Sequence, residues 1–194
     1  MRSGEVTRNT KETKIHVNFE IDGSGKCRCD TGIGFFDHMI NSFTRHGLFD
    51  LDLEVDGDLE VDTHHTVEDT GIALGQAIAK AVGDKKGIVR YGSVILPMDE
   101  SLVLVSLDLS GRPYLVWDCD LTAERVGALE TETVREFFYA VSYSAMMNLH
   151  VRVLAGGNTH HVIEATFKAF AKALDAATTK DPRIADVLST KGSL

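Results

Sequence analysis

A five-residue pattern, His-His-x-x-Glu, occurs twice in the chain, as HHTVE at 64–68 and as HHVIE at 160–164. The two copies hold four of the eight histidines, so chance placement is a poor explanation. Imidazole and carboxylate groups gathered in one short segment are typical of a metal-binding site. The paired pentads are therefore the strongest chemical signal in the sequence.

The spacing inside each pentad decides which side chains can share an ion. On a helix, residues four apart lie on one face, whereas adjacent residues diverge by about 100°. The first histidine of each pentad can therefore meet the glutamate of its own pentad at one ion. These pairs are His64 with Glu68 and His160 with Glu164. The second histidines, His65 and His161, point elsewhere, which indicates a dinuclear site at an interface between repeats or subunits.

Two further residues are candidate ligands because of their places in the chain. His38 lies in the predicted helix before the first pentad, and Glu136 lies near the matching place before the second. The donor set then contains imidazole and carboxylate groups without thiolate, which suits Mn, Fe, Co or Zn. Six-coordinate Mn²⁺ is a reasonable choice where carboxylates are abundant.

The pentads belong to a long internal repeat that must position them. Each half has the order strand, strand, helix, strand, helix, and the pentad opens the last helix. Residue ranges are assigned to two of the three strands and to both helices of each half: strands 12–23 and 48–55 with helices 34–47 and 64–83, then strands 100–111 and 149–155 with helices 133–150 and 160–178. Thr63 and Thr159 stand just before the pentads and are expected to cap these helices.

This order predicts an α+β or mixed α/β fold with a pseudo-twofold relation between the halves. The length suits a single domain, 1–194, built from two repeats at about 1–86 and 87–180. The loop 83–92 is the expected joint between them. The tail 181–194 has no strong hydrophobic period, and we expect an extended segment there.

Composition excludes several classes of protein. Apolar residues make up 43% and charged residues 25%, which are ordinary values for a globular protein. The net charge of −9 argues against a nucleic-acid-binding surface. No apolar run is long enough to cross a bilayer, and the first residues lack the apolar core of a signal peptide. The chain has three cysteines, Cys27, Cys29 and Cys119, an odd number without the spacing of a disulfide framework. We expect them to be free thiols in a reducing cytoplasm.

Several segments resemble the imidazoleglycerol-phosphate dehydratase family of histidine biosynthesis over nearly the whole chain. They are GIGFFDHM, DTHHTVEDTGIALG, RYG, PMDES, LSGRPYL and NTHHVIEATFKAFAKAL. The resemblance implies a duplicated fold of the ribosomal-protein-S5 domain 2 type. It also implies two Mn²⁺ ions per active site, and a cage of 24 subunits in which neighbouring subunits share the sites.

The resemblance also assigns roles to individual residues. The implied metal ligands are His38, His64, His65, Glu68, Glu136, His160, His161 and Glu164. Some family members have EHFF where this chain has REFF, so Glu136 replaces a histidine ligand of those relatives. The implied substrate-binding residues are Glu12, Arg90, Arg112, Lys168, Ser189 and Lys191, of which the last two lie in the tail and close on the phosphate.

The reaction implied by the resemblance removes water from imidazole-glycerol phosphate and gives imidazole-acetol phosphate. The hydrogen on the carbon that bears the ring is not acidic beside a neutral imidazole. Two metal ions, one on each ring nitrogen, would hold the ring as imidazolate, and this deprotonated ring is electron-rich enough to expel the hydroxyl group. A carboxylate must take the proton. Glu12 and Glu164 are the candidates, and we favour Glu12 because Glu164 is expected to bind metal.

Two other functions fit part of the pattern. A dinuclear metallohydrolase also uses histidine and glutamate ligands, and activity on a generic phosphoester would favour it. A non-catalytic metal-storage cage needs many carboxylates along a channel and no arginine anchors, so Arg90, Arg112 and Lys191 argue against it.

Overall fold

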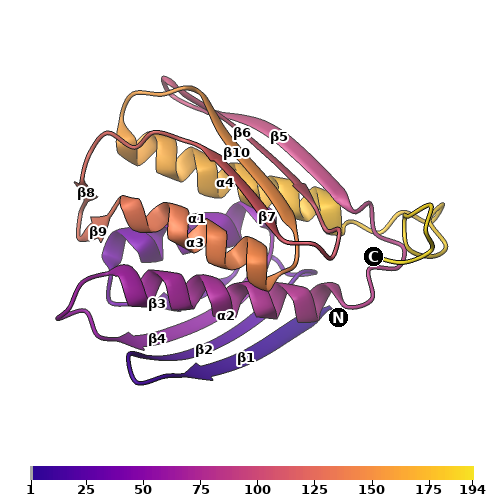
Figure 1. Cartoon of the computed structure of the whole chain (residues 1–194), viewed down its shortest axis with the longest axis horizontal. Helices are drawn as coiled ribbons and strands as arrows, with labels where there is room; N and C mark the ends of the chain where they lie inside the picture. Colours follow the sequence, from indigo (N-terminus) through magenta and orange to yellow (C-terminus); the bar gives the residue numbers. More distant parts are fainter. Residues whose placement is uncertain (1) are drawn as a thin grey trace.

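The computed structural model describes residues 2–194 and contains two four-stranded sheets with four helices between them (Figure 1). The first half consists of β1 (Ser3–Asn9), β2 (Thr13–Glu20), β3 (Cys27–Asp30), α1 (Gly34–Gly47), β4 (Asp50–Gly57) and α2 (His64–Val82). The second half consists of β5 (Tyr91–Met98), β6 (Ser101–Asp108), β7 (Tyr114–Asp118), β8 (Arg125–Val126), β9 (Leu129–Glu130), α3 (Glu132–Ser144), β10 (Asn148–Ala155) and α4 (Thr159–Thr178).

The two sheets have the same topology. Their strand orders are β1-β2-β4-β3 and β5-β6-β10-β7, and in each the last pair is parallel while the others are antiparallel. The α+β class and the duplication are therefore confirmed. Each half has one more strand than the sequence suggested, β3 in the first and β7 in the second. The hairpin β8–β9 has no counterpart in the first half.

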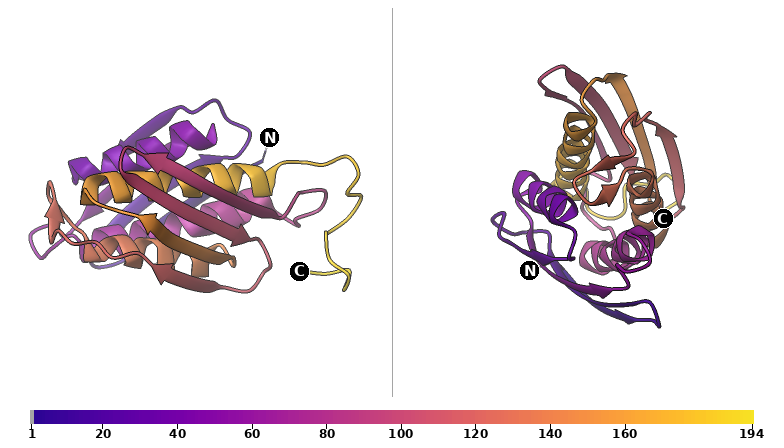
Figure 2. Two further views of the ribbon diagram at one scale, coloured as in Figure 1. Left: turned by 90° about the horizontal axis from the view of Figure 1, so that it is seen from above. Right: turned by 90° about the vertical axis from the view of Figure 1, so that its left-hand side faces the viewer.

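The helices form a middle layer between the two sheets (Figure 2), and the core consists of apolar side chains from these helices and from the strands that they cover. Aromatic rings connect the helices of different halves. Phe43 of α1 stacks on Phe170 of α4 at 5.5 Å, and Phe36 meets Phe137 of α3 edge-on at 5.3 Å. Because each half supplies only part of this cluster, neither half buries its apolar surface without the other.

Two glycines allow the long helices to lie close to their sheets. A side chain at Gly4 would come within 2.0 Å of the carbonyl oxygen of Ala77 in α2. At Gly92 the same atom would come within 1.8 Å of the carbonyl oxygen of Ala173 in α4. The close approach is thus repeated in both halves, and only glycine fits it.

Helices α1 and α3 have matching patterns of burial. The two helices can be aligned by placing His38 opposite Glu136 in sequence. In this alignment every fully buried apolar side chain of α1 corresponds to a buried apolar side chain of α3. The pairs are Phe36 with Val134, Met39 with Phe137, Ile40 with Phe138 and Phe43 with Val141. Leu48 and Met146, which follow the helices in the same alignment, both have left-handed backbones with φ of 57° and 55°. His38 and Glu136 are therefore structurally equivalent.

Two local predictions were wrong. The helix expected over 133–150 ends at Ser144, because the chain reverses at Met146 and enters β10. No glycine or proline in that stretch marks the stop. Helix α4 is capped by Asn158 and not by Thr159, which is its first residue.

The capping of α2 also differs from expectation. Thr63 occupies the N-cap position but makes no capping hydrogen bond. Its hydroxyl donates to Glu130 at 2.8 Å, and Asp62 accepts from the backbone N–H of His64 at 2.8 Å. Asp62 therefore acts at α2 as Asn158 does at α4.

The tail follows α4 without a helix or strand between residues 181 and 194, but it is not the extended segment that we expected, because it turns at Asp181–Ile184 and again at Ser189–Gly192. Backbone hydrogen bonds fasten it to the loop that joins the two halves, from Asp181 to Gly87 at 2.9 Å and from Gly87 to Asp186 at 3.1 Å. No helix within residues 2–194 is long and apolar enough to cross a bilayer. The expected free thiols are confirmed for all three cysteines, and burial raises the pKa of Cys119 to about 12.

Candidate functional site

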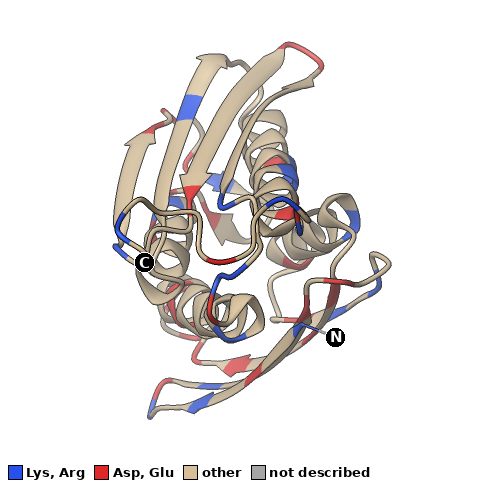
Figure 3. Ribbon diagram, turned by 90° about the vertical axis from the view of Figure 1, so that its right-hand side faces the viewer, with Lys and Arg blue, Asp and Glu red and all other residues tan. Residues whose placement is uncertain are grey.

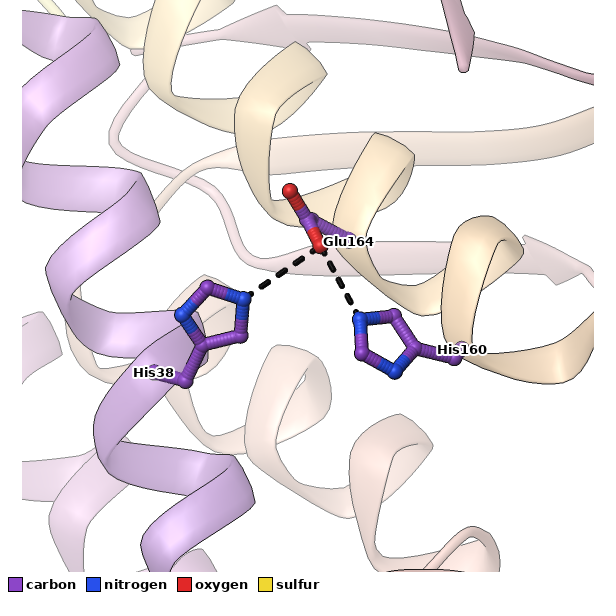
Figure 4. A group of neighbouring side chains, drawn as sticks. All are labelled: His38, His160 and Glu164. Atoms are coloured by element: carbon purple, nitrogen blue, oxygen red, sulfur yellow. Dashed lines mark hydrogen bonds and ion pairs between the residues drawn. The ribbon is translucent and has the colours of Figure 1, made fainter. Parts of the chain in front are cut away.

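Three side chains from the two halves converge at the start of α4 (Figure 4). Nε2 of His38, on α1, lies 3.4 Å from Oε2 of Glu164, and Nε2 of His160 lies 3.1 Å from the same oxygen. One donor atom from each residue lies within 4.8 Å of the other two. The helical spacing of the pentad brings His160 and Glu164 together as predicted, and the packing of α1 on α4 adds His38.

Glu164 is the buried member of this cluster, with 8% of its surface exposed. Its second oxygen, Oε1, lies 2.6 Å from the ammonium group of Lys168, one helical turn further on. Burial opposes ionisation of this carboxyl, but Lys168, His160 and His38 outweigh burial, so the pKa of Glu164 lies below its usual value. The carboxylate is thus ionised and able to bind a cation near neutral pH.

The equivalent cluster in the other pair of helices is less closed. His64 and Glu68 lie 3.5 Å apart on α2, as the spacing predicts. Helix α3 packs against α2, and its residue Glu136 is the counterpart of His38. The carboxylate of Glu136 pairs with Arg135 at 2.8 Å and does not converge with the other two in this structure.

The second histidines of the pentads have different partners from the first. Nδ1 of His161 lies 2.9 Å from Oε2 of Glu100, and Nδ1 of His65 lies 2.9 Å from Oδ2 of Asp58. These hydrogen bonds raise the pKa of both imidazoles. Glu12 lies further from His65, with 4.0 Å between Oε2 and Nδ1.

Asp58 and Glu100 were not among the residues predicted for the site. For Glu100 a signal was present, since it begins the second repeat segment where Glu12 begins the first. Hydrogen bonds from His161 and the backbone of Asn158 lower its pKa to about 2. Asp58 lies in the loop between β4 and α2 and has no counterpart in the repeat, so the pattern could not single it out.

A basic hollow of about 600 Å³ lies between the tail and the start of the second sheet, and all four anion-binding candidates line it. These are Arg90, Arg112, Ser189 and Lys191. Arg90 is already engaged, because its guanidinium donates to Asp108 at 2.7 and 3.0 Å and to the carbonyl of Leu188 at 2.7 Å. It therefore holds the tail.

Arg112 and Lys191 are the exposed cations of this hollow. The guanidinium of Arg112 has a single long contact, 3.5 Å to the carbonyl of Ser110. Lys85 lies close by and was not singled out from the sequence. Burial lowers the pKa of Lys85, and the nearby Arg90 and Arg112 act in the same direction.

The starts of α2 and α4, which carry the pentads, and the tail, which lines the basic hollow, lie at opposite ends of the molecule (Figure 1). The second pentad opens α4 and the tail follows its other end, and a helix of 20 residues is about 30 Å long. Figure 3 looks onto the tail end, where lysine and arginine positions of the tail and of neighbouring loops lie among acidic ones. One chain therefore does not bring its predicted metal ligands and its predicted phosphate ligands together.

The fold and these clusters define a duplicated α+β protein with imidazole–carboxylate centres at the junction of its repeats. Residues 31–174 match the sequence model of imidazoleglycerol-phosphate dehydratase. The chain is 63% identical over 193 residues to the imidazoleglycerol-phosphate dehydratase of Acetivibrio thermocellus, covering 100% of this chain and 99% of that protein. It is 60% identical over 194 residues to the enzyme of that name from Ruminiclostridium cellulolyticum, covering 100% of both.

Solved structures agree with this match. The crystal structure of imidazoleglycerol-phosphate dehydratase from Staphylococcus aureus has a TM-score of 0.84 at 41% identity, covering 92% of this chain and 99% of that one. The structure from Pyrococcus furiosus in complex with (S)-C348 also has a TM-score of 0.84, at 34% identity, covering 97% and 100%. The chain belongs to the imidazoleglycerol-phosphate dehydratase family and is thus a hydro-lyase.

Proposed function

We propose that this chain removes water from imidazole-glycerol phosphate to give imidazole-acetol phosphate, in the cytoplasm, with two Mn²⁺ ions per active site. The observation that carries the proposal is the convergence of His38, His160 and Glu164 from the two halves of a chain in this dehydratase family. The substrate has an imidazole ring at one end and a phosphate at the other. The chain has a cluster suited to each, the imidazole–carboxylate centre and the basic hollow.

The donor set fits a metal ion. Around an octahedral ion with metal–donor distances of about 2.1 Å, neighbouring donors lie about 3 Å apart. The separations of 3.1 and 3.4 Å between Glu164 and the two histidine nitrogens agree with this geometry. Imidazole and carboxylate ligands without thiolate suit Mn²⁺.

The equivalence of α1 and α3 supports a second ion centre at His64, Glu68 and Glu136. Its ligands are the repeat counterparts of His160, Glu164 and His38. The rings of His65 and His161 diverge from these centres by the geometry of a helix, so we assign them to ions that neighbouring copies of the chain share. Bound Mn²⁺ would supply Lewis acidity at the imidazole end of the substrate.

We assign to Glu12 the role of the base that removes the proton from the carbon beside the ring. Its side chain is about half exposed, and its nearest ionic neighbour is His65 at 4.0 Å. Glu164 is a poorer base for this proton, because Lys168 and two histidines already hold its oxygens. Lys168 keeps Glu164 ionised and lies beside it, where the substrate would contact both.

We propose that the basic hollow binds the phosphate group of the substrate. Arg112 and Lys191 have free cationic groups there, and Ser189 offers a hydroxyl. Arg90 contributes by fixing the tail through Leu188. Binding energy at the phosphate holds the reacting end of the substrate in place, although the phosphate takes no part in the elimination.

The distance between the two clusters supports a site shared between subunits. The substrate is far shorter than α4, so a molecule bound at the pentads of one chain cannot reach the hollow of the same chain. A neighbouring copy must supply the phosphate ligands. A homo-oligomer of 24 subunits, as the family resemblance implies, is the assembly that we propose.

A metal-depletion experiment tests the proposal. Purified protein is treated with a chelator, assayed with imidazole-glycerol phosphate, and assayed again after Mn²⁺ is restored. We expect chelation to abolish formation of imidazole-acetol phosphate and Mn²⁺ to restore it. Full turnover by protein shown to be metal-free would refute the metal dependence, and no product with any divalent ion would refute the reaction.

A further inference from the structure

The two histidines that point away from their own clusters share one contact. Nδ1 of His65 and Nδ1 of His161 each lie 2.9 Å from a carboxylate oxygen, of Asp58 and of Glu100 respectively. His64 and His160 differ, because they turn Nε2 toward the glutamate one turn further along their own helix. The contact at Nδ1 is therefore particular to the second histidine of each pentad.

The two carboxylates reach this atom from unrelated places in the repeat. Glu100 lies in the turn between β5 and β6, where its repeat counterpart is Glu12. Asp58 lies in the loop after β4. If the contact were only a remnant of the duplication, equivalent residues would make it in both halves. The two halves instead arrive at the same hydrogen bond by different routes, which indicates that the bond itself has a function.

The carboxylate of Glu100 is held firmly in its place. Its other oxygen accepts from the backbone N–H of Asn158 at 2.7 Å and from the hydroxyl of Ser101 at 3.2 Å. Gly157 leaves room for it, because a side chain there would come within 2.8 Å of Cγ of Glu100. The ring of His161 is thus fixed to the β5–β6 turn and to the segment that enters α4.

The carboxylate of Asp58 has one hydrogen-bond partner in this structure. Oδ2 accepts from His65, while Oδ1 is buried and has no partner. A buried oxygen without a partner costs about 1–3 kcal/mol, so this carboxylate is costly to keep. Glu12 stays at 4.0 Å from the same imidazole nitrogen, outside hydrogen-bonding distance, and its carboxylate remains free.

A carboxylate that accepts at Nδ1 requires the hydrogen of the neutral ring to be there. The lone pair is then on Nε2, and the ring cannot rotate. We propose that Asp58 and Glu100 are positioning residues that fix the Nδ1–H tautomer and the orientation of His65 and His161, so that Nε2 of each ring is presented to Mn²⁺. This inference rests on the metal centres proposed above and assigns their outer partners.

The test measures the affinity of the assembled, metal-depleted protein for Mn²⁺ by titration, without reference to activity. Loss of an outer carboxylate of this kind weakens metal binding by about 10–100-fold. We expect Asp58→Ala and Glu100→Ala each to show such a loss, while circular dichroism shows an intact fold. Asp56→Ala is the matched control, since Asp56 lies two residues from Asp58, is 79% exposed and pairs with Lys14 rather than with a histidine. It should bind Mn²⁺ as the unaltered protein does.

The variant Asp58→Asn tests whether Asp58 acts by orienting the ring of His65 or only by its negative charge. The amide oxygen can accept from His65 as Oδ2 does, and its NH₂ group takes the place of the unpartnered Oδ1. If Asp58 orients the ring, Asn should retain affinity within about 3-fold of the unaltered protein. Asn as weak as Ala would show that only the negative charge matters and would overturn the positioning role.

The remaining outcomes are also distinct. Unaltered protein that binds two Mn²⁺ equivalents, with Ala variants of equal affinity, would refute this inference and leave the proposed function standing. Unaltered protein that binds no Mn²⁺ would refute both. Should Glu100→Ala fail to fold, the Asp58 pair of variants decides the matter alone.

Discussion

Nε2 of His38 lies 3.4 Å from Oε2 of Glu164, although 126 positions separate these residues in the chain. The contact joins the first repeat to the second at the start of α4. It depends on the packing of α1 on α4, which the stacked rings of Phe43 and Phe170 hold in place. The cluster of His38, His160 and Glu164 therefore depends on both halves, since neither half contains all three residues.

His38→Ala should remove one Mn²⁺ equivalent per subunit and leave the fold intact. The side chain of His38 is 52% exposed, so its loss opens no cavity in the core. Equilibrium dialysis with metal analysis measures the stoichiometry. His150→Ala is the control, because His150 is exposed on β10 and belongs to neither pentad. Two tight equivalents in the His38 variant would remove this residue from the site.

Glu136 gives a second prediction, which depends on the register of the buried residues in α1 and α3. Glu136→Ala should lose one Mn²⁺ equivalent while the protein stays folded. Glu136→His should keep both, because it places at position 136 the imidazole that the equivalent residue His38 has. A solvent-facing residue would instead change stability within about 0.5 kcal/mol and nothing else. Two equivalents with normal turnover in the Ala variant would show that Glu136 is no ligand.

At the basic hollow, Arg112 and Arg90 should respond differently. Arg112→Ala removes a free cation and should raise KM for the substrate about 10–100-fold, as expected for one lost charge-assisted hydrogen bond. Arg90→Ala leaves Asp108 unpaired and releases Leu188, so it should lower the free energy of unfolding by about 3 kcal/mol. Steady-state kinetics and chemical denaturation measure the two effects. Arg152→Ala, at an exposed ion pair on the second sheet, should change neither.

The tail itself can be tested by truncation before Ser189. Loss of Ser189 and Lys191 should raise KM in the same direction as Arg112→Ala. It should also lower turnover if the tail closes over the phosphate. Kinetic constants equal to those of the full chain would exclude the tail from the site.

Gly92 tests the close contact of α4 with its sheet. A methyl group at this position would overlap the carbonyl of Ala173, so Gly92→Ala should lower the free energy of unfolding by about 1–3 kcal/mol. Gly34→Ala is a matched control, because a methyl group there meets nothing within 4 Å. Urea denaturation compares the two. Equal stability would mean that the strand and helix can separate without cost.

The sequence predicted the elements well where a repeated pattern was present. The pentads, the duplication and helix α1 follow from spacing and hydrophobic period. Strands β3 and β7 could not be predicted in this way, because both are short and only half-buried. The predicted end of helix α3 was too far along the chain. The turn at Met146 has a left-handed backbone, and no glycine in the sequence marks it.

Within the site, contacts along one helix were predictable and contacts between elements were not. His160 and Glu164 meet because they are four residues apart. The approach of Asp58 and Glu100 to the second histidines depends on where two loops end in space. Arg90 matched a phosphate-binding position in sequence, yet here its guanidinium is held by Asp108 and Leu188. Pairing of this kind is set by tertiary packing, and a motif does not encode it.

Co-assembly of two inactive variants tests most directly whether neighbouring subunits complete each other's sites. Chains with His160→Ala and chains with Arg112→Ala are produced alone and together in equal amounts, and dehydration of imidazole-glycerol phosphate is measured. Each variant alone should be impaired at every site. In the mixed assembly, about one quarter of the sites should combine an intact pentad from one chain with an intact hollow from another, if two chains form each site. Activity well above that of either variant alone is the predicted result, and activity no higher than the average of the two variants would contradict the shared site.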